Sequence, residues 1–464
     1  MHLRAVSRQG TASQQLCGVV SGRRGAHHSG WTGSVNTCAP LFRALSVHMP
    51  LPLPIEIVEY ILDLAGAFPD LSAHLSPPYF LYSADHVLPL SAIKLSASTF
   101  FSLALVCKQW DAICTPRLYR CLAIVDDSDI VALLRTLEES QITATVSGGL
   151  GSLTRHLIIA LSDTALNDDD SEGLVRRIQR RFGNLGRLAR CLPHLEILSI
   201  SIFTQDTLGL RLPYYGKDFA ASVIQTCAPS LFKLHLHHEA LVLFSRQELR
   251  NLLESSPNLT AITGAGVGDC LGCPVTLPYL PKLKYLAVNS TMKRCDNTGH
   301  EDDQTPLLDH IHIRQSLLSD HWVHLLSAQG ARLTSVSLDL RLSQEPENCC
   351  DYLSKFTEFC PNLSYLEICI DNWFSFPRLK SLPPVERLGI HVQAGKTIRM
   401  TNVDTICKAL ATIQSPSLKV IQLMSPGIFE QFASSDNVES AWSPLVDHAF
   451  QVVDCDGREL GPPE

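Results

Sequence analysis

Apolar residues recur in one fixed arrangement along the second half of the chain. In segments such as CLPHLEILSI and FCPNLSYLEI, an apolar residue is followed by two others, an apolar residue, one other and a third apolar residue. Stretches such as SRQELRNLLES and DYLSKFTEFC lie between these segments and have the apolar spacing of helices. Nine segments share the pattern, and their first apolar residues, 22 to 36 positions apart, are Leu195, Leu231, Leu259, Leu283, Leu308, Leu333, Leu363, Val385 and Leu418.

A unit of this length accommodates one short strand and one helix. The pattern resembles the leucine-rich repeat in a degenerate form, and the resemblance extends from about Leu153 to Leu423. Proteins of that kind stack parallel strands along a concave face and place their helices outside. The resemblance therefore implies an α/β fold with an irregular leucine-rich-repeat solenoid over residues 126–430, followed by a C-terminal tail over residues 431–464.

The region just before the first full repeat also has a periodic pattern. Asp129 precedes Ile130, Leu133 and Leu137, which predicts a helix over about 126–140 with Asp129 as its cap. The segment SLTRHLIIA, residues 152–160, predicts a short apolar strand. We therefore expect the solenoid to begin before Cys191.

Two amphipathic stretches precede the solenoid. In LPIEIVEYILDLAG, Pro54 stands in the first turn of a predicted helix, ahead of an apolar stripe formed by Ile57, Ile61 and Leu64. In FSLALVCKQWDAICTPRLYR, a second helical stripe is predicted, and Pro116 is expected to end that helix. Helices of this size bury little surface alone, which suggests that one face contacts a partner.

The Leu-Pro start and the SLALVCKQW block resemble the F-box, a motif of three helices. That resemblance implies docking on the Skp adaptor of a cullin–RING ubiquitin ligase, through the matching positions Leu53, Pro54, Ile57, Ile61, Leu103, Val106, Cys107 and Trp110. The spacing departs from the family, because residues 67–98 separate the two halves and contain Pro77-Pro78, which favours a loop. We expect an F-box-like domain over residues 49–125 with a long internal loop at 67–98.

If both resemblances hold, the chain is a substrate-recognition subunit of a Skp–cullin–F-box ubiquitin ligase. The helices would hold the adaptor, and through it the cullin scaffold, while the repeats bind an unknown target protein. The alternative is a non-catalytic repeat scaffold whose F-box-like helices merely cap the solenoid. The two hypotheses differ in whether Leu53, Ile57, Leu103 and Trp110 face outward or pack against the first strands.

The concave face of the predicted solenoid is the expected site for a target. Alternate residues of each strand should point there, toward solvent. They form a mixed polar surface without a strong charge, which suits a protein ligand better than a phosphate backbone. The candidate target-binding residues are His235, His237, Asn289, Arg314, Asp339, Glu367 and His391.

Composition and charge exclude several classes of protein. The 464 residues are 45% hydrophobic and 18% charged, with a formal net charge of −8, which argues against a general nucleic-acid binder. A run of eighteen apolar residues does not occur, so we expect no membrane association. Sixteen cysteines without framework spacing favour reduced thiols and a cytoplasmic or nuclear location.

Residues 1–48 differ in kind from the rest of the chain, with five arginines and no acidic residue. We interpret them as a disordered basic tail or an extension of the gene model, because Met49 stands directly before the F-box-like start. A mitochondrial transit peptide has the same composition and is the alternative.

Candidate chemistry is sparse. Cys270 and Cys273 have the spacing of zinc ligands, with Cys295 and His300 downstream, but a second Cys-x-x-Cys pair is missing. We therefore expect thiols in a loop between repeats, and no metal. The sequence contains no GxSxG, HExxH or kinase signature. We expect neither an enzyme nor a cofactor.

Overall fold

The computed structural model of the chain contains one sheet of twelve parallel strands whose spatial order follows the sequence, β1 to β12. It describes residues 87–143, 149–162, 171–203, 216–236, 243–264, 277–289, 305–314, 321–340, 349–370, 372–373, 382–392, 403–425, 428–433 and 438–461. The strands are β1 (Cys121–Ile124), β2 (His156–Ser162), β3 (Ile197–Phe203), β4 (Lys233–Leu236), β5 (Ala261–Gly264), β6 (Tyr285–Asn289), β7 (His310–Arg314), β8 (Ser335–Asp339), β9 (Tyr365–Ile370), β10 (Arg387–Val392), β11 (Val420–Leu423) and β12 (Gln451–Asp454).

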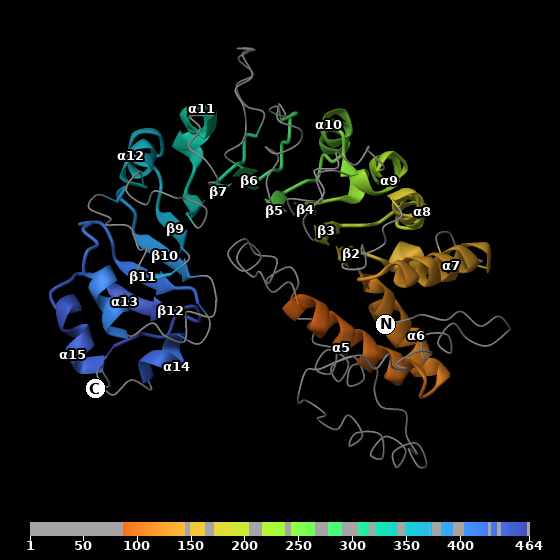
Figure 1. The fold of residues 1–464 in the computed structure, drawn as a ribbon, viewed down its shortest axis with the longest axis horizontal. Helices are drawn as coiled ribbons and strands as arrows, with labels where there is room; N and C mark the ends of the chain where they lie inside the picture. Colours follow the sequence, from red (N-terminus) through yellow and green to blue (C-terminus); the bar gives the residue numbers. More distant parts are fainter. Residues whose placement is uncertain are drawn as a thin grey trace.

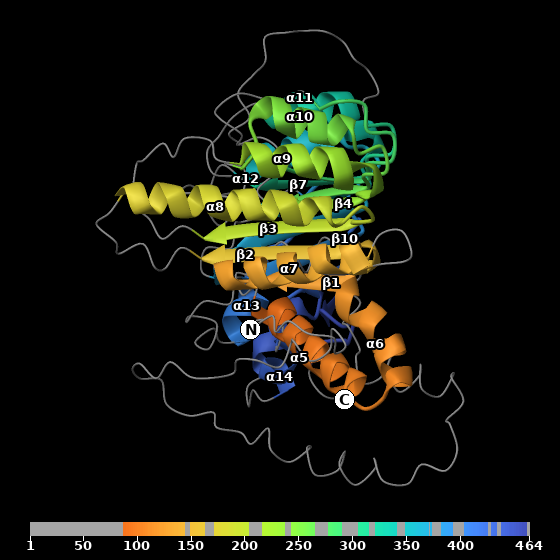
Figure 2. The ribbon, with the colours of Figure 1, turned by 90° about the vertical axis from the view of Figure 1, so that its right-hand side faces the viewer.

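Helices alternate with the strands, and the sheet bends into an arc with α7 to α12 on its outer side (Figure 1). The side view in Figure 2 shows successive helices and strands stacked in chain order. The helices are α5 (Val87–Ala104), α6 (Lys108–Arg120), α7 (Asp127–Thr143), α8 (Ser171–Arg190), α9 (Lys217–Ser222), α10 (Arg246–Glu254), α11 (His321–Gln329), α12 (Cys349–Phe359), α13 (Val403–Leu410), α14 (Ile428–Ala433) and α15 (Val438–Trp442). Short 3₁₀ or π turns lie at Leu150–Leu153, Val223–Cys227, Ala228–Ser230, Gly330–Arg332 and Ser443–Leu445. This is a leucine-rich-repeat-like α/β solenoid.

The first leucine of most repeats closes a tight turn that leads into the strand. The amide of Leu259 donates to the carbonyl of Ser256 at 3.1 Å, and equivalent bonds join Leu231 to Ala228 and Leu283 to Leu280 at 3.2 Å. Beyond the leucine, backbone amides of each repeat donate hydrogen bonds to carbonyl groups of the preceding repeat. This shared turn explains why the pattern recurs at unequal intervals, since insertions fall elsewhere in the unit.

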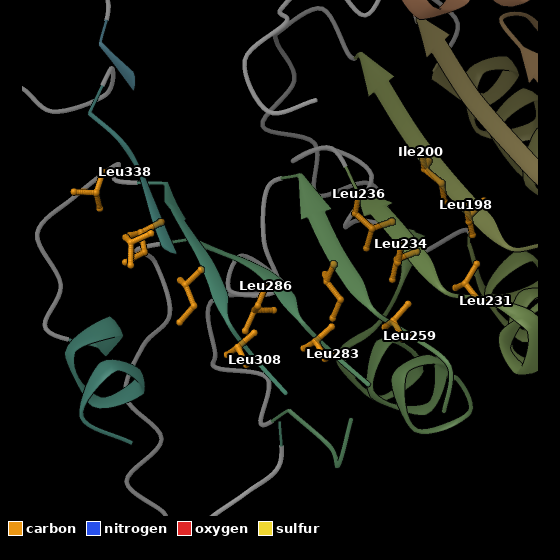
Figure 3. Packing of buried hydrophobic residues seen from close by; sticks show 14 of the residues in the cluster. Leu198, Ile200, Leu231, Leu234, Leu236, Leu259, Leu283, Leu286, Leu308 and Leu338 are labelled. Atoms are coloured by element: carbon orange, nitrogen blue, oxygen red, sulfur yellow. The ribbon is translucent and has the colours of Figure 1, made fainter. Parts of the chain in front are cut away.

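The apolar core lies between the sheet and the outer helices. Leu234, Leu286 and Leu366 lie on one row that crosses the sheet from β4 to β9, and each is completely buried. Figure 3 shows how leucines from adjacent repeats stack against one another in this layer. Each such side chain contributes on the order of 1.5–3 kcal/mol through burial. Because a single unit cannot enclose its leucines, the repeats stabilise one another.

Helix boundaries agree with the predicted spacers. The stretch before Pro257 forms α10, whose N-terminus is a capping box in which Ser245 and Glu248 exchange hydrogen bonds. The helix expected over 126–140 is α7, but its cap is Asp126, which accepts a hydrogen bond from the amide of Asp129 at 2.9 Å. The prediction of Asp129 as the cap was therefore wrong by one turn. Asp129 instead accepts from the amide of Val125 at 3.1 Å.

The N-terminal helical region differs from the prediction in three ways. Residues 87–98, expected within a loop, belong to α5, and the chain turns at residues 105–107 before α6. Leu103 and Trp110 therefore lie on two antiparallel helices rather than on one stripe. Pro116 lies inside α6, which continues to Arg120 because Tyr119 is buried against the solenoid core.

The expected C-terminal tail is instead part of the solenoid. Residues 431–461 include α15 and β12, and Gln451 of β12 pairs with Val420 of β11. Asp454 ends the sheet, fully buried, and accepts from the Arg458 side chain at 2.6 Å. In the described ranges, no helix is long and apolar enough to cross a membrane.

Candidate functional site

The turn between α5 and α6 presents an exposed apolar surface. Leu105 and Val106 are 48% and 51% exposed, and Cys107 beside them is exposed as well. Leu103, by contrast, is buried with Phe100 in the core of this helical pair. We call Leu105, Val106 and Cys107 the turn patch. Two of the predicted adaptor residues thus face solvent.

The remaining adaptor residues of the described chain have other environments. Trp110 is partly buried and packs against the small core that contains Leu103, Ala104 and Cys114. Leu53, Pro54, Ile57 and Ile61 lie outside the described residues, as do residues 1–48. A pair of helices that docks on a partner needs exposed apolar residues for the contact and a buried core that holds the helices together. The turn patch and the core around Leu103 have these two properties.

Helix α5 also contacts the inner face of the sheet. Ile93 is buried in a cluster with Cys121, Ile158 and Ile197, which come from β1, β2 and β3. These three residues point away from the outer helices, so α5 covers the concave side of the first strands (Figure 1). The helical pair therefore shields one end of the solenoid.

The polar residues predicted for the concave face do alternate with the core leucines, but several are buried rather than exposed to solvent. Ser199, His235, Ser337, Asp339 and Glu367 are each less than 5% exposed. Neighbouring strands bring large side chains together on this face, and the sequence of a single strand does not reveal that enclosure. The expectation of a solvated row was wrong for these positions.

The candidate target-binding residues occupy two rows of this face. In the first row, His235 on β4 lies 2.8 Å from Thr263 on β5 through its Nδ1 atom, and Glu367 lies further along on β9. In the second row, backbone pairing joins Asn289, Arg314, Asp339, Cys369 and His391 across five strands. His391 is partly exposed. His237 lies outside the described residues.

A chain of hydrogen bonds crosses the middle of the concave face. The Ser337 hydroxyl donates to Glu367 at 2.8 Å and lies 3.2 Å from His310 Nε2, while His310 Nδ1 bonds to the Ser335 hydroxyl. The Tyr285 ring stacks on His310 with centroids 4.4 Å apart. We call Tyr285, His310, Ser335, Ser337 and Glu367 the polar network.

Burial controls the protonation of this network. It raises the pKa of Glu367 to about 8, against which the hydrogen bond from Ser337 acts weakly. Burial, with a smaller effect of His312, lowers the pKa of His310 to about 3. The pKa of Tyr285 is raised by burial and by Glu367. At neutral pH the network is therefore uncharged, with a protonated Glu367 and a neutral His310.

Serine, histidine and a carboxylic acid invite comparison with a hydrolytic triad, but the order of the bonds is different. In a triad the carboxylate orients the histidine, which removes the serine proton. Here Glu367 contacts Ser337 rather than His310, and it is neutral. His310, with its lowered pKa, is a poor base. The arrangement suits a structural network and gives no support to catalysis.

An open cavity of about 700 Å³ lies beside this network, toward the C-terminal strands. Its lining includes Tyr365, Arg387, Val420 and Gln422 of β9 to β11, together with Met424 and Cys455. The Gln422 side chain donates to the carbonyl of Cys455 at 3.2 Å and so joins β11 to the turn after β12. This size is typical of pockets that bind small ligands or side chains.

Sequence reasoning missed most residues of the network and the cavity. Tyr285, His310 and Arg387 lie four positions before the residues it selected in the same strands, and therefore on the same face. The alternation along the strand could have identified them. Their proximity could not be predicted, because it depends on the register between repeats.

Metal ligation has no candidate in the described part of the chain, where no group of three or more metal-binding side chains comes together. Cys270, Cys273, Cys295 and His300 lie outside the described residues. Nine cysteines whose side chains the structure describes are free thiols, and seven of them are buried. Burial raises the pKa of Cys227 and Cys360 to about 12, so these thiols are unreactive.

No protein-family model matches the sequence. The curated proteins likewise contain no match. The likeness of residues 53–119 to an F-box therefore remains a prediction from the residues quoted above.

Proposed function

We propose that the protein is a substrate-recognition subunit of a Skp–cullin–F-box ubiquitin ligase. The observation that carries the proposal is the turn patch, where Val106 and Cys107 are exposed while Leu103 forms the core beneath them. An apolar surface on a helical pair is suited to a helix-lined partner. In this role the chain performs no chemistry. It raises the effective concentration of the target near the ubiquitin-carrying partner.

The junction between helices and repeats supports the same function. Helix α6 ends at Arg120, and β1 begins at Cys121 without a linker. Leu118 and Tyr119 of α6 pack against the solenoid core. A rigid junction of this kind would hold an adaptor and a target in a constant relative orientation, which proximity-based transfer requires.

The experiment is a binding assay with purified Skp adaptor and the full chain. Val106→Asp should weaken binding at least about tenfold, because it places a charge in a desolvated apolar contact. Val131→Asp is the matched control, since Val131 on α7 is 55% exposed and lies outside the turn patch. Leu53→Ala/Pro54→Ala tests the first half of the motif. Circular dichroism verifies that each variant is folded.

The proposal fails if the folded wild-type chain does not bind the adaptor, or if Val106→Asp binds as tightly as Val131→Asp does. The first result would favour the second candidate, a repeat scaffold with an N-terminal cap. One observation favours that candidate: Ile93 of α5 is buried against Cys121, Ile158 and Ile197 on the concave side of the first strands. A cap needs this contact, whereas an adaptor-binding motif does not.

A further inference from the structure

The concave cavity near the C-terminal end of the sheet has an unbalanced positive charge. Glu386 and Lys419 at its rim neutralise each other, with 2.6 Å between the Glu386 carboxylate and the Lys419 ammonium group. Arg387 is exposed at the same place, and within the described part of the chain its guanidinium group makes no ion pair or hydrogen bond.

An arginine with free donors recognises a specific chemical group. Its planar guanidinium forms two parallel hydrogen bonds with a carboxylate, and such charge-assisted bonds are about twice as strong as neutral ones. Strand register places Arg387 between Tyr365 and Val420, and all three residues line the cavity. A carboxylate that enters here therefore meets the arginine between two less polar side chains.

The remainder of the cavity favours an apolar group. Met424 is 7% exposed, and Val420, four positions earlier on the same face, is partly buried. Gly389 lies on the neighbouring strand, and the hydroxyl end of Tyr365 occupies the space where a side chain at Gly389 would be. The Tyr365 ring is thus inclined across the face and forms one wall. Methionine adapts its shape to different apolar groups.

These features specify the occupant. We propose that the cavity binds a short extended segment of the target protein in which an Asp or Glu side chain is paired with Arg387 and neighbouring apolar side chains rest on Val420 and on Met424. This inference rests on the proposed function, since it names the chemistry of the target that the repeats receive. The cavity volume of about 700 Å³ is sufficient for a few side chains.

The test is selection from a random heptapeptide display library with the full chain as bait. The wild-type chain should enrich peptides with Asp or Glu one or two positions from an apolar residue. Arg387→Glu should lose that enrichment and favour Lys or Arg, because its charge is reversed. Arg387→Lys should keep the acidic preference with about tenfold weaker binding, since the two-pronged contact is lost. Arg190→Glu, an exposed arginine on α8, is the matched control.

A second measurement locates the peptide. Cys455 is partly exposed and lines the cavity, whereas Cys107 is exposed in the turn patch. A selected acidic peptide should slow maleimide labelling of Cys455 at least about threefold and leave Cys107 labelling unchanged. Mass spectrometry of proteolytic fragments measures both rates in one sample.

The inference is overturned if the wild-type chain selects no peptides or peptides without acidic residues, or if Arg387→Glu selects the same peptides as the wild type. Unprotected Cys455 in the presence of a saturating peptide would also overturn it. These outcomes leave the proposed function open to its own test, because adaptor binding depends on the turn patch. A chain that binds the adaptor but not acidic peptides would recognise its target by another surface.

Discussion

Replacing Glu367 by glutamine tests the protonation of the polar network. Glu367 is fully buried on β9, with a hydrogen bond from Ser337 on one oxygen. Its other oxygen, Oε1, has no hydrogen-bond partner among the residues that the structure describes. Glutamine has nearly the same shape as a protonated glutamic acid but cannot ionise. The substitution therefore removes the proton equilibrium and preserves the packing.

The effect on stability follows from proton linkage. Between pH 4.5 and about 8 the native state retains a proton on Glu367 that the unfolded chain releases, so the free energy of unfolding falls by about 1.4 kcal/mol per pH unit as pH rises. His310 acts in the opposite direction. Between pH 6.5 and about 3 the unfolded chain binds a proton that native His310 does not, so stability falls as pH falls.

The two contributions cancel where they overlap. From pH 4.5 to 6.5 the network makes no net contribution to the pH dependence, and from pH 6.5 to 8 Glu367 alone lowers the stability by about 2 kcal/mol. Relative to the wild type, Glu367→Gln should therefore gain about 3 kcal/mol of stability between pH 5.5 and pH 8. The gain is an upper bound, because local opening that hydrates the carboxylate costs less than full ionisation in place.

Urea unfolding followed by circular dichroism measures this difference. Wild type, Glu367→Gln and the control Glu439→Gln, an exposed glutamate on α15, are compared at pH 5.5, 6.5 and 8. We expect the free energy of unfolding of Glu367→Gln to increase relative to that of the wild type as pH rises. The difference between Glu439→Gln and the wild type should stay constant. If the difference between Glu367→Gln and wild type is the same at pH 5.5 and pH 8, Glu367 is ionised in the native state and the proposed network is incorrect.

Two further predictions concern the repeats themselves. A side chain at Gly330 would collide with the carbonyl oxygen of Phe359 and lie 3.0 Å from its carbonyl carbon, so Gly330→Ala should cost about 1–3 kcal/mol. Gly183→Ala in α8 meets nothing within 4 Å and should instead stabilise by about 0.5–1 kcal/mol; equal melting temperatures for the two variants would contradict this contrast. Ser245→Ala removes a cap of α10 and should cost about 1 kcal/mol by urea unfolding, with no loss if Glu248 alone satisfies the helix end.

The solenoid was predictable from the sequence because the residues that stabilise each repeat lie within a few positions of one another. Each repeat needs an apolar residue that closes a turn and two more that face the helices, and Leu231, Leu234 and Leu236 show this within one unit. The capping box of α10 is likewise contained within four consecutive residues, Ser245 to Glu248. Insertions between repeats do not change these short sequence patterns, so they can still be recognised.

Other features depend on contacts between distant segments and were missed for that reason. Residues 431–461 have a weak repeat pattern, yet β12 joins the sheet because Val420 of β11 offers an open edge. Residues 87–98 were expected to form a loop, but Ile93 finds a buried place against Ile158 and Ile197, which lie far along the chain. The burial of Glu367 depends in the same way on β8 to β10, which no single strand reveals.

The two proposed surfaces lie at opposite arms of the arc, which has a consequence for how the protein could work (Figure 1). Helix α5 covers the concave side of β1 to β3. The polar network fills the centre of the concave face. The cavity beside Arg387 is an open part of this face in the described ranges. A target held there and an adaptor held at the turn patch would be joined by a continuous parallel sheet rather than a flexible linker. The number of repeats between the two surfaces would then set the separation between target and adaptor, so the solenoid would act as a spacer as well as a binding surface.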